Sequence, residues 1–249
     1  MEKVDWFLGP DEKKNSGIDY YSRIFIEKLN SQGFSVRTHT IPYQSRSLSR
    51  YIYQFLFYPI IALTTTKRKV VIYEESLAFL IPIINLVGGT SILIYHHLPE
   101  LNQINKLNSF AEKVKNLFVR ILSFFIRFAD VIVVPSEMTK NELITKKQIK
   151  SEKIKVIYNP FELNDFQFEL DREEFFKSFK MPISEKTKII LNVGSEQSRK
   201  NVKTIIASLI GLKNEDYLLV KIGSPISNDN HQEHRKIVDE NQLNVKFIT

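Results

Sequence analysis

The sequence contains no cysteine among its 249 residues. Disulfides, thiolate metal sites and cysteine nucleophiles are therefore excluded, while the redox compartment stays open. No stretch reaches the roughly 18 uninterrupted apolar residues of a membrane-spanning helix. The N-terminus enters an apolar, strand-like run at once and lacks the basic start and small-residue cleavage site of a secretory signal. We therefore expect a cytoplasmic protein.

What the chain does contain is ordinary for a globular protein, with 43% hydrophobic and 25% charged residues. Its formal net charge of +7 favours anionic partners, which include nucleic acids, anionic lipids and nucleotide-linked substrates. An α/β protein recruited to nucleic acid is the weaker of these alternatives. The sequence shows no RNA-binding aromatic signature, no zinc-finger spacing and no basic tail.

Short apolar runs alternate with helical patterns along the whole chain, which predicts parallel sheets with helices on both faces. Strands are expected at Val4–Leu8, Ser35–Thr40, Val70–Tyr73, Ser91–Tyr95, Val131–Pro135, Lys155–Tyr158, Lys188–Val193, Tyr217–Ile222 and Asn244–Ile248. Helices are expected at Ile18–Ser31, Gln103–Phe128, Thr139–Lys147, Arg172–Ser178, Val202–Leu212 and His231–Asn241.

An acidic stretch, 159–171, breaks this alternation between two basic flanks. Pro160 keeps Asn159 out of helical conformation, and a new strand–turn–helix unit begins at Lys188. We therefore predict two doubly wound domains, residues 1–160 and 186–249, joined by a linker over 161–185. The second would hold only about three strands and two helices, fewer than a usual domain has.

The segment Asn192–Asn201 is the most specific local pattern in the chain. It places a glycine turn with adjacent cations, Arg199 and Lys200, between a strand and a helix. A helix start offers unpaired N–H groups and partial positive charge, and the two cations suit a phosphate or diphosphate. A solvated basic turn is the alternative.

Two stretches combine aromatic and basic residues. In Gln103–Phe128, apolar residues recur at helical spacing at positions 107, 110, 114, 117, 121, 124 and 128, and basic residues line the flank. We favour packing of this row on the sheet, and docking on an anionic membrane is the alternative. Arg50–Leu63 is crowded with aromatic residues and leaves both alternatives and its secondary structure open.

Several motifs, in order, resemble those of glycosyltransferase family 4. Asn15–Tyr20, with Gly17, resembles the glycine loop after the family's first strand, with Ser16 in place of a second glycine. Ile92–Pro99 resembles the strand that ends in a His-Asp pair. His96 matches the histidine, and His97 replaces the aspartate.

Further along, Asp130–Ser136 resembles the last main strand of the family's first domain, and Ile154–Pro160 resembles the approach to its linker. Val193–Asn201 resembles the family's Gly-Thr-x-x-x-Arg-Lys-Asn motif. The resemblance implies the GT-B fold, in which two Rossmann-like domains are paired, with the second incomplete here.

The resemblance also implies a function. Family members transfer a sugar from a nucleotide-diphosphate donor to a hydroxyl acceptor, glycan or lipid-linked, with retention and without a metal or other cofactor. By this match Lys200, with Arg199, Gly194, Ser195 and Gly17, would bind the donor diphosphate, and His96 would face the transferred sugar as the catalytic residue. An anionic membrane surface at the inner face is a further expected partner, and nucleic acid is not.

One family motif is missing. Members carry a Glu-x7-Glu motif that binds the donor, and no glutamate here has a partner eight positions on. The chain therefore looks C-terminally truncated. The alternative to an active enzyme is a non-catalytic subunit or remnant that needs a second chain to complete the donor domain.

Two other groups of titratable residues could carry chemistry. His231 and His234 share a helix face, but no third ligand is evident nearby, so we predict no metal site. Glu74 and Glu75 follow a strand and could line a cleft, although we expect a solvated acidic turn.

Overall fold

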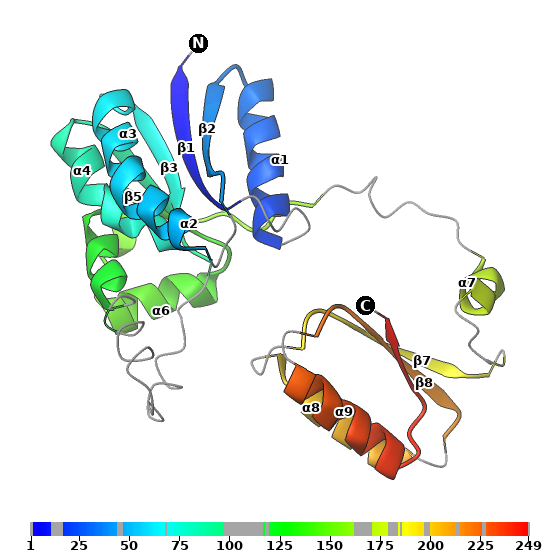
Figure 1. The fold of residues 1–249 in the computed structure, drawn as a ribbon. Coiled ribbons are helices and arrows are strands. Elements are labelled where there is room, and N and C mark those ends of the chain that lie inside the picture. The colour runs from blue at the N-terminus through cyan, green and yellow to red at the C-terminus, as the bar shows by residue number, and fades with distance from the viewer. Residues whose placement is uncertain are drawn as a thin grey trace. The chain divides into compact units, whose positions relative to one another are not determined.

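The computed structural model describes residues 2–10, 17–43, 47–67, 69–96, 117, 120–161, 171–178, 184, 186–196, 200–212, 215–225 and 228–248. The chain divides into two compact units, Met1–Asn164 and Asp165–Thr249 (Figure 1). Each unit is built around a parallel sheet of its own, which confirms the predicted α/β class.

The first unit contains a six-stranded sheet in the order β2-β1-β3-β4-β5-β6, with every neighbouring pair parallel. Its strands are β1 (Lys3–Pro10), β2 (Ser35–Ile41), β3 (Val70–Glu74), β4 (Thr90–Ile94), β5 (Val131–Val134) and β6 (Ile154–Val156). β1 therefore lies between β2 and β3, and the strand order reverses there.

Helices cover both faces of this sheet, because alternate strand residues point to opposite sides. Val4 and Trp6 of β1 pack with Tyr21 on the side of α1, while Phe7 points to the opposite core. The helical elements are α1 (Gly17–Ser31), α2 (Leu48–Ile52), η2 (Tyr53–Phe57), α3 (Tyr58–Thr65), η3 (Glu75–Leu80), α4 (Ile81–Leu86), η5 (Ile126–Phe128), α6 (Glu137–Lys147) and η6 (Ser151–Lys153).

The second unit contains a three-stranded parallel sheet in the order β7-β8-β9. Its elements are α7 (Arg172–Ser178), β7 (Lys188–Val193), α8 (Val202–Ser208), η9 (Leu209–Leu212), β8 (Tyr217–Ile222), α9 (Asn228–Glu240) and β9 (Val245–Ile248). Ile206 and Val238 bring α8 and α9 onto one face, and Phe176 brings α7 onto β8 from the other.

The nine predicted strands are all present, two of them with the predicted bounds. The helical prediction was incomplete. Residues 48–65 are helical, and they include Arg50–Leu63, whose secondary structure the sequence left open. Residues 75–86, for which no helix was predicted, are also helical. Of the predicted helix Gln103–Phe128, only residues 117 and 120–128 lie within the described part, and all of these are helical.

The prediction of which side of that helix packs on the sheet was wrong for its described part. Leu117, Ile121, Phe124 and Phe128 are exposed, whereas Ile126 is buried in the core and Leu122 and Phe125 pack against it. Periodicity located the apolar row but did not show which apolar side faces the sheet, since both sides of the helix are apolar.

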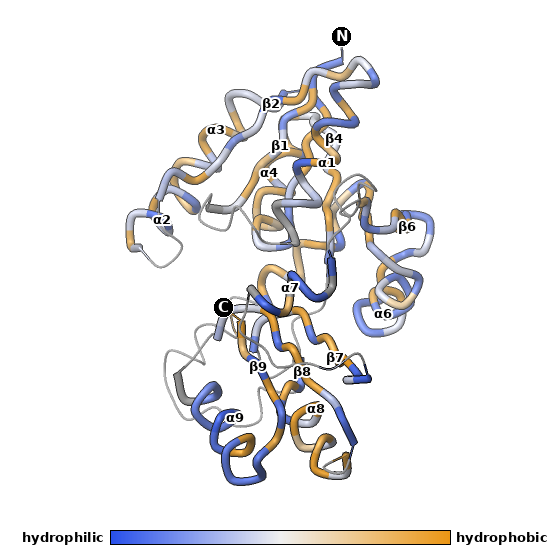
Figure 2. Tube along the Cα trace, turned by 90° about the vertical axis from the view of Figure 1, so that its right-hand side faces the viewer, coloured by the Kyte–Doolittle hydropathy of each residue, from blue (hydrophilic) through white to orange (hydrophobic). Residues whose placement is uncertain are grey.

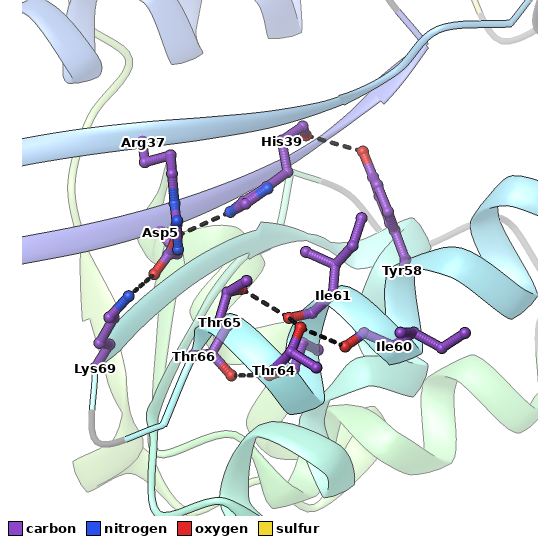
Figure 3. Close-up of polar contacts among 11 residues, drawn as sticks. Asp5, Arg37, His39, Tyr58, Ile60, Ile61, Thr64, Thr65, Thr66 and Lys69 are labelled. Atoms are coloured by element: carbon purple, nitrogen blue, oxygen red, sulfur yellow. Dashed lines mark hydrogen bonds and ion pairs between the residues drawn. The ribbon is translucent and has the colours of Figure 1, made fainter.

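A buried carboxylate joins three segments of the first sheet (Figure 3). Asp5 is 1% exposed in the middle of β1 and accepts hydrogen bonds from Arg37 Nε at 2.6 Å and His39 Nε2 at 2.8 Å. Lys69 Nζ lies 3.4 Å from its second oxygen. Burial by itself would raise the pKa of Asp5, but the His39 and Arg37 contacts outweigh it and leave that pKa below its usual value.

Asp5→Asn should therefore destabilise the first unit by about 1–3 kcal/mol at neutral pH, because it leaves Arg37, His39 and Lys69 around a neutral group. The folded pKa is the lower one, so this stabilisation is complete above the unfolded pKa of about 3.9 and is lost as the pH falls through the folded pKa. Urea unfolding followed by the fluorescence of Trp6, the only tryptophan, measures it. The assignment would be contradicted if the variant and the unchanged protein were equally stable at neutral pH, or if their difference in stability did not decrease in acid. Glu27→Gln, which removes one partner of an exposed pair with Arg23, is the control.

Candidate functional site

In the first unit, the strand order marks where a ligand would bind. Open parallel sheets bind ligands beyond the carboxyl ends of the strands, at the point where the order reverses. That point lies between β1 and β3. At the end of β1, a Cβ on Gly9 would lie 3.7 Å from the Glu74 carboxylate, so the side chain at the end of β3 reaches the neighbouring strand.

Glu75 and His96 meet at the same edge. The backbone N–H of His96 points to Glu75 Oε2 at 3.4 Å, and the His96 ring stands edge-on to Tyr21 of α1, with centroids 4.9 Å apart. Tyr95 N donates to Val133 O, which fixes the chain just past β4. The structure thus places His96 at the edge of the sheet where the sequence placed it.

Glu75 does not form the solvated turn that the sequence suggested. Its side chain is only partly exposed, and burial raises its pKa to about 7. A carboxyl group with this pKa exchanges protons near neutral pH, which is the range that general acids and bases use. Sequence reasoning missed it because its burial comes from neighbours on other strands and helices.

Gly17 is the first residue of α1, and Tyr21, one turn later, contacts His96. The backbone therefore brings the predicted glycine and the predicted histidine to one region of the first unit. The loop residues Asn15 and Ser16 lie outside the described residues, and so does His97, which stands where the family has aspartate.

In the second unit, the turns after β7 and β8 touch through their backbones. Gly194 and Gly223 have φ values of 145° and 126°, which favour glycine. A Cβ on Gly223 would lie 2.3 Å from Gly194 O, so no larger residue fits without movement. Gly194 N also donates to Ile222 O at 2.9 Å. The predicted glycine turn is therefore held against its neighbour.

A buried lysine on β8 connects these two turns. Lys221 is fully buried, and its Nζ donates to Gly194 O at 2.5 Å and Ile222 O at 3.2 Å. Burial lowers the pKa of Lys221, and the nearby charge of Glu196 opposes that change. The amino group of Lys221 thus holds the carbonyl of the glycine turn, while the N–H groups of Gly194 and Glu196 donate to Ile222 O and Ser224 O.

Glu196 is the partner of the two histidines that the sequence singled out. It is 1% exposed, and its carboxylate accepts from His231 Nδ1 and His234 Nδ1, each at 2.9 Å. Arg235 Nε donates to His231 Nε2, so His231 contacts Glu196 through Nδ1 and Arg235 through Nε2. Burial would raise the pKa of Glu196, but the hydrogen bonds from the histidines outweigh it and lower that pKa.

The remaining predicted donor residues lie on the segment between β7 and α8. Ser195 is half-buried beside Gly194, and Lys200 is exposed just before Asn201, whose φ of 50° is left-handed. Arg199 lies outside the described part of the chain. The structure thus groups Gly194 and Ser195 and leaves the Lys200 side chain at the surface. In the described ranges, no cluster of three or more His, Asp or Glu side chains is arranged to hold a metal ion.

Two signals in the sequence could have found the buried cluster. Lys221 is a lone cation inside the apolar run Tyr217–Ile222, and a charged residue there needs dedicated partners. The second signal is the His231-x-x-His234 spacing, which places two imidazoles on one side of a helix. In the structure both imidazoles hydrogen-bond to the carboxylate of Glu196.

Glu75→Gln should stabilise the first unit relative to the unchanged protein as the pH rises from about 4.5 to about 7. The folded pKa is the higher one, so ionising Glu75 costs stability across this window and costs the full amount above it. The gain should reach about 1–3 kcal/mol in urea unfolding monitored by Trp6. A difference that does not change with pH would contradict the assignment, and Glu137→Gln, at an exposed position, is the control.

Glu196→Ala should destabilise the second unit by about 1–3 kcal/mol, because it leaves the imidazole N–H groups of buried His234 and partly buried His231 without their acceptor. Hydrogen–deuterium exchange should become faster in the turn around Gly194 and along α9, since both are joined through Glu196. Glu233→Ala, which removes an exposed carboxylate of α9 that pairs with Lys203 of α8, should change neither quantity. Unchanged exchange in the Glu196 variant would show that the cluster does not hold the turn.

Comparisons with solved structures establish what this fold resembles. The Anabaena protein Alr3699/HepE, solved with UDP and glucose, has a TM-score of 0.67 and 15% identity, over 99% of this chain and 69% of that chain. The catalytic domain of starch synthase IV from Arabidopsis thaliana, bound to ADP and acarbose, has a TM-score of 0.66 and 10% identity, over 100% of this chain and 74% of that chain. The apo lipopolysaccharide outer core galactosyltransferase WaaB has a TM-score of 0.56 and 15% identity, over 98% and 67%.

Because these identities are low, the three structures show similarity of fold alone. The fold is GT-B-like, as the sequence predicted. A search of curated proteins with this sequence found no significant match. A family model, Glycosyltransferase Family 4, matches residues 20–165, which is more than half of the sequence. The matched residues include Tyr21, Glu75 and His96. Because the match covers more than half of the sequence, this chain belongs to glycosyltransferase family 4.

Proposed function

We propose that this chain transfers a sugar from a nucleotide-diphosphate sugar to a hydroxyl acceptor, glycan or lipid-linked, in the cytoplasm. The family match over residues 20–165 is the observation that carries the proposal. The GT-B-like fold supports it, since similar structures were solved with UDP and glucose or with ADP and acarbose. Transfer with retention and without a metal is part of the proposal and follows from the family resemblance alone.

The donor side lies in the second unit. Lys221 Nζ donates a hydrogen bond to Gly194 O, so the turn at Gly194 and Ser195 would present a fixed backbone to a phosphate group. Lys200, exposed on the same segment, is available to an anion, and Arg199 would add a second cation. Negative charge builds on the leaving diphosphate as the glycosidic bond breaks, and fixed positive groups stabilise it. Charge-assisted hydrogen bonds of this kind contribute about 1.5–3 kcal/mol each.

The acceptor side lies in the first unit. His96 and Gly17 would shape the surface that meets the sugar and the acceptor, as the resemblance implies. Glu75 adds a carboxylate beside His96 with a pKa of about 7. Such a group can accept a hydrogen bond from an acceptor hydroxyl, which would orient the oxygen for attack. No protein nucleophile is needed in the front-face mechanism discussed for the family.

A non-catalytic subunit is the second candidate. The family match is compatible with it, because residues 20–165 cover the first unit and almost none of the second. Such a subunit would retain the acceptor-side unit and obtain the missing donor contacts from a second chain. Sugar transfer by the isolated protein would exclude it.

Lys200→Ala should weaken binding of UDP or ADP at least tenfold, about 1.4 kcal/mol, because it removes a cation from the diphosphate position. The fold should stay intact, since the side chain is exposed. Titration calorimetry with each nucleotide measures the effect. Lys236→Ala, at another exposed position of the same unit, is the matched control. Equal affinities for the Lys200 variant and the unchanged protein would refute the assignment.

A further inference from the structure

The helical run α2–η2–α3 carries large apolar side chains on its exposed outer side. Every fourth residue from position 54 to position 66 is buried, namely Gln54, Tyr58, Ala62 and Thr66. Tyr58 anchors the run, because its hydroxyl lies 2.7 Å from Leu8 O and 2.8 Å from His39 O. The opposite side carries large side chains that are 40–76% exposed: Leu48, Tyr51, Ile52, Phe55, Leu56, Phe57, Ile60 and Leu63.

These residues form rows rather than scattered points. Leu48, Ile52, Leu56 and Ile60 are spaced by four along the helix, and Tyr51 and Phe55 form a second row beside them. Figure 2 shows hydrophobic positions along this run. Contiguous apolar surface of this extent on a soluble protein usually marks an interaction site.

Neighbouring elements extend the same surface. α3 packs against α4, whose last residue, Leu86, is 80% exposed. Asn85 Nδ2 donates to Phe128 O at 2.9 Å, which places the end of α4 beside η5. In Figure 1, α3 and α4 lie on the same side of the sheet. We define the apolar face as the exposed residues of the α2–η2–α3 run together with Leu86, Ile121, Phe124 and Phe128.

The helical run α2–η2–α3 and its flanks carry positive charge. Residues 42–73 contain five Lys or Arg and no Asp or Glu, and one of the five, Lys69, is paired with Asp5. Arg50 lies over the Tyr51 ring at 5.1 Å, and Arg127 lies over the Phe124 ring at 4.9 Å. Arginine and aromatic side chains with an apolar body and a polar tip fit the boundary between lipid tails and headgroups. Basic residues next to apolar ones attract anionic lipid.

We propose that the apolar face docks this protein on an anionic lipid surface. The contact is peripheral, because none of the helices in the described ranges is both long and apolar enough to cross a membrane. A second copy of the chain fits less well, since self-association would bring like charges together. The docking proposal is based on the exposed residues of this face. The purpose of docking, the delivery of a lipid-linked acceptor, rests on the proposed function.

Co-sedimentation of the full chain with vesicles tests the proposal. The protein should pellet with vesicles of phosphatidylcholine and phosphatidylglycerol at low salt, and less with phosphatidylcholine alone. Replacing Ile52, Leu56 and Ile60 together by serine should weaken partitioning at least about tenfold, because lipid no longer buries that row. The matched control replaces Met138, Ile210 and Leu212, which are exposed elsewhere, by serine and should pellet as the unchanged protein does.

Folding of both variants is checked by circular dichroism and Trp6 fluorescence, and nucleotide titration separates docking from donor binding. The proposal is overturned if the unchanged protein ignores anionic vesicles, or if the row variant binds them equally well. Self-association in ultracentrifugation that the row variant abolishes, without vesicle binding, would assign the face to a second copy and also overturn it. Loss of nucleotide binding with docking intact would count against the proposed function alone.

Discussion

Parallel pairing of β1 with strands on both sides is the constraint on which the first unit depends. Parallel strands bring their carboxyl ends to one edge, and the central position of β1 brings Gly9, Glu74 and Glu75 together at that edge. The second sheet follows the same rule with fewer strands, since Gly194 and Gly223 end adjacent strands and meet backbone to backbone. In both units the positions with special chemistry follow from strand direction rather than from their spacing along the chain.

The two edges differ in their electrostatics. In the first unit the edge carries carboxylates, one of which keeps its proton up to about pH 7 because it is partly removed from water. In the second unit a buried ammonium binds backbone carbonyls, and the carboxylate of Glu196 is matched by histidines that donate to it. An edge with hydrogen-bond acceptors suits a hydroxyl compound, and an edge with an exposed cation at Lys200 suits an anion. This division agrees with a reaction between an alcohol and a nucleotide-linked sugar.

Much of the fold could be predicted from the sequence, because its strands are short apolar runs bounded by turns. Lys188–Val193 and Tyr217–Ile222 were located to the residue. The helical run 48–65 was not predicted because large apolar side chains are exposed on it while polar Gln54 is buried, so no amphipathic period appears. At the candidate site, His96 could be located from the end of a strand. The burial of Glu75 and the partners of Glu196 could not, because each depends on contacts between segments about 20 to 40 positions apart.

The π-helical turn Tyr53–Phe57 also constrains how this chain can vary. Such a turn holds one residue more than an α-helical turn, and each residue of an α-helix advances about 100° around the axis. Deleting one residue inside this turn would restore α-helical hydrogen bonding and leave the flanking helices in register, because the turn accommodates the extra residue. A deletion elsewhere in the run would rotate the residues on one side of it by about 100° against Tyr58, whose hydroxyl is held at Leu8 O and His39 O. The run should therefore accept many exchanges of one apolar side chain for another, while single-residue deletions in functional variants should be confined to the π turn.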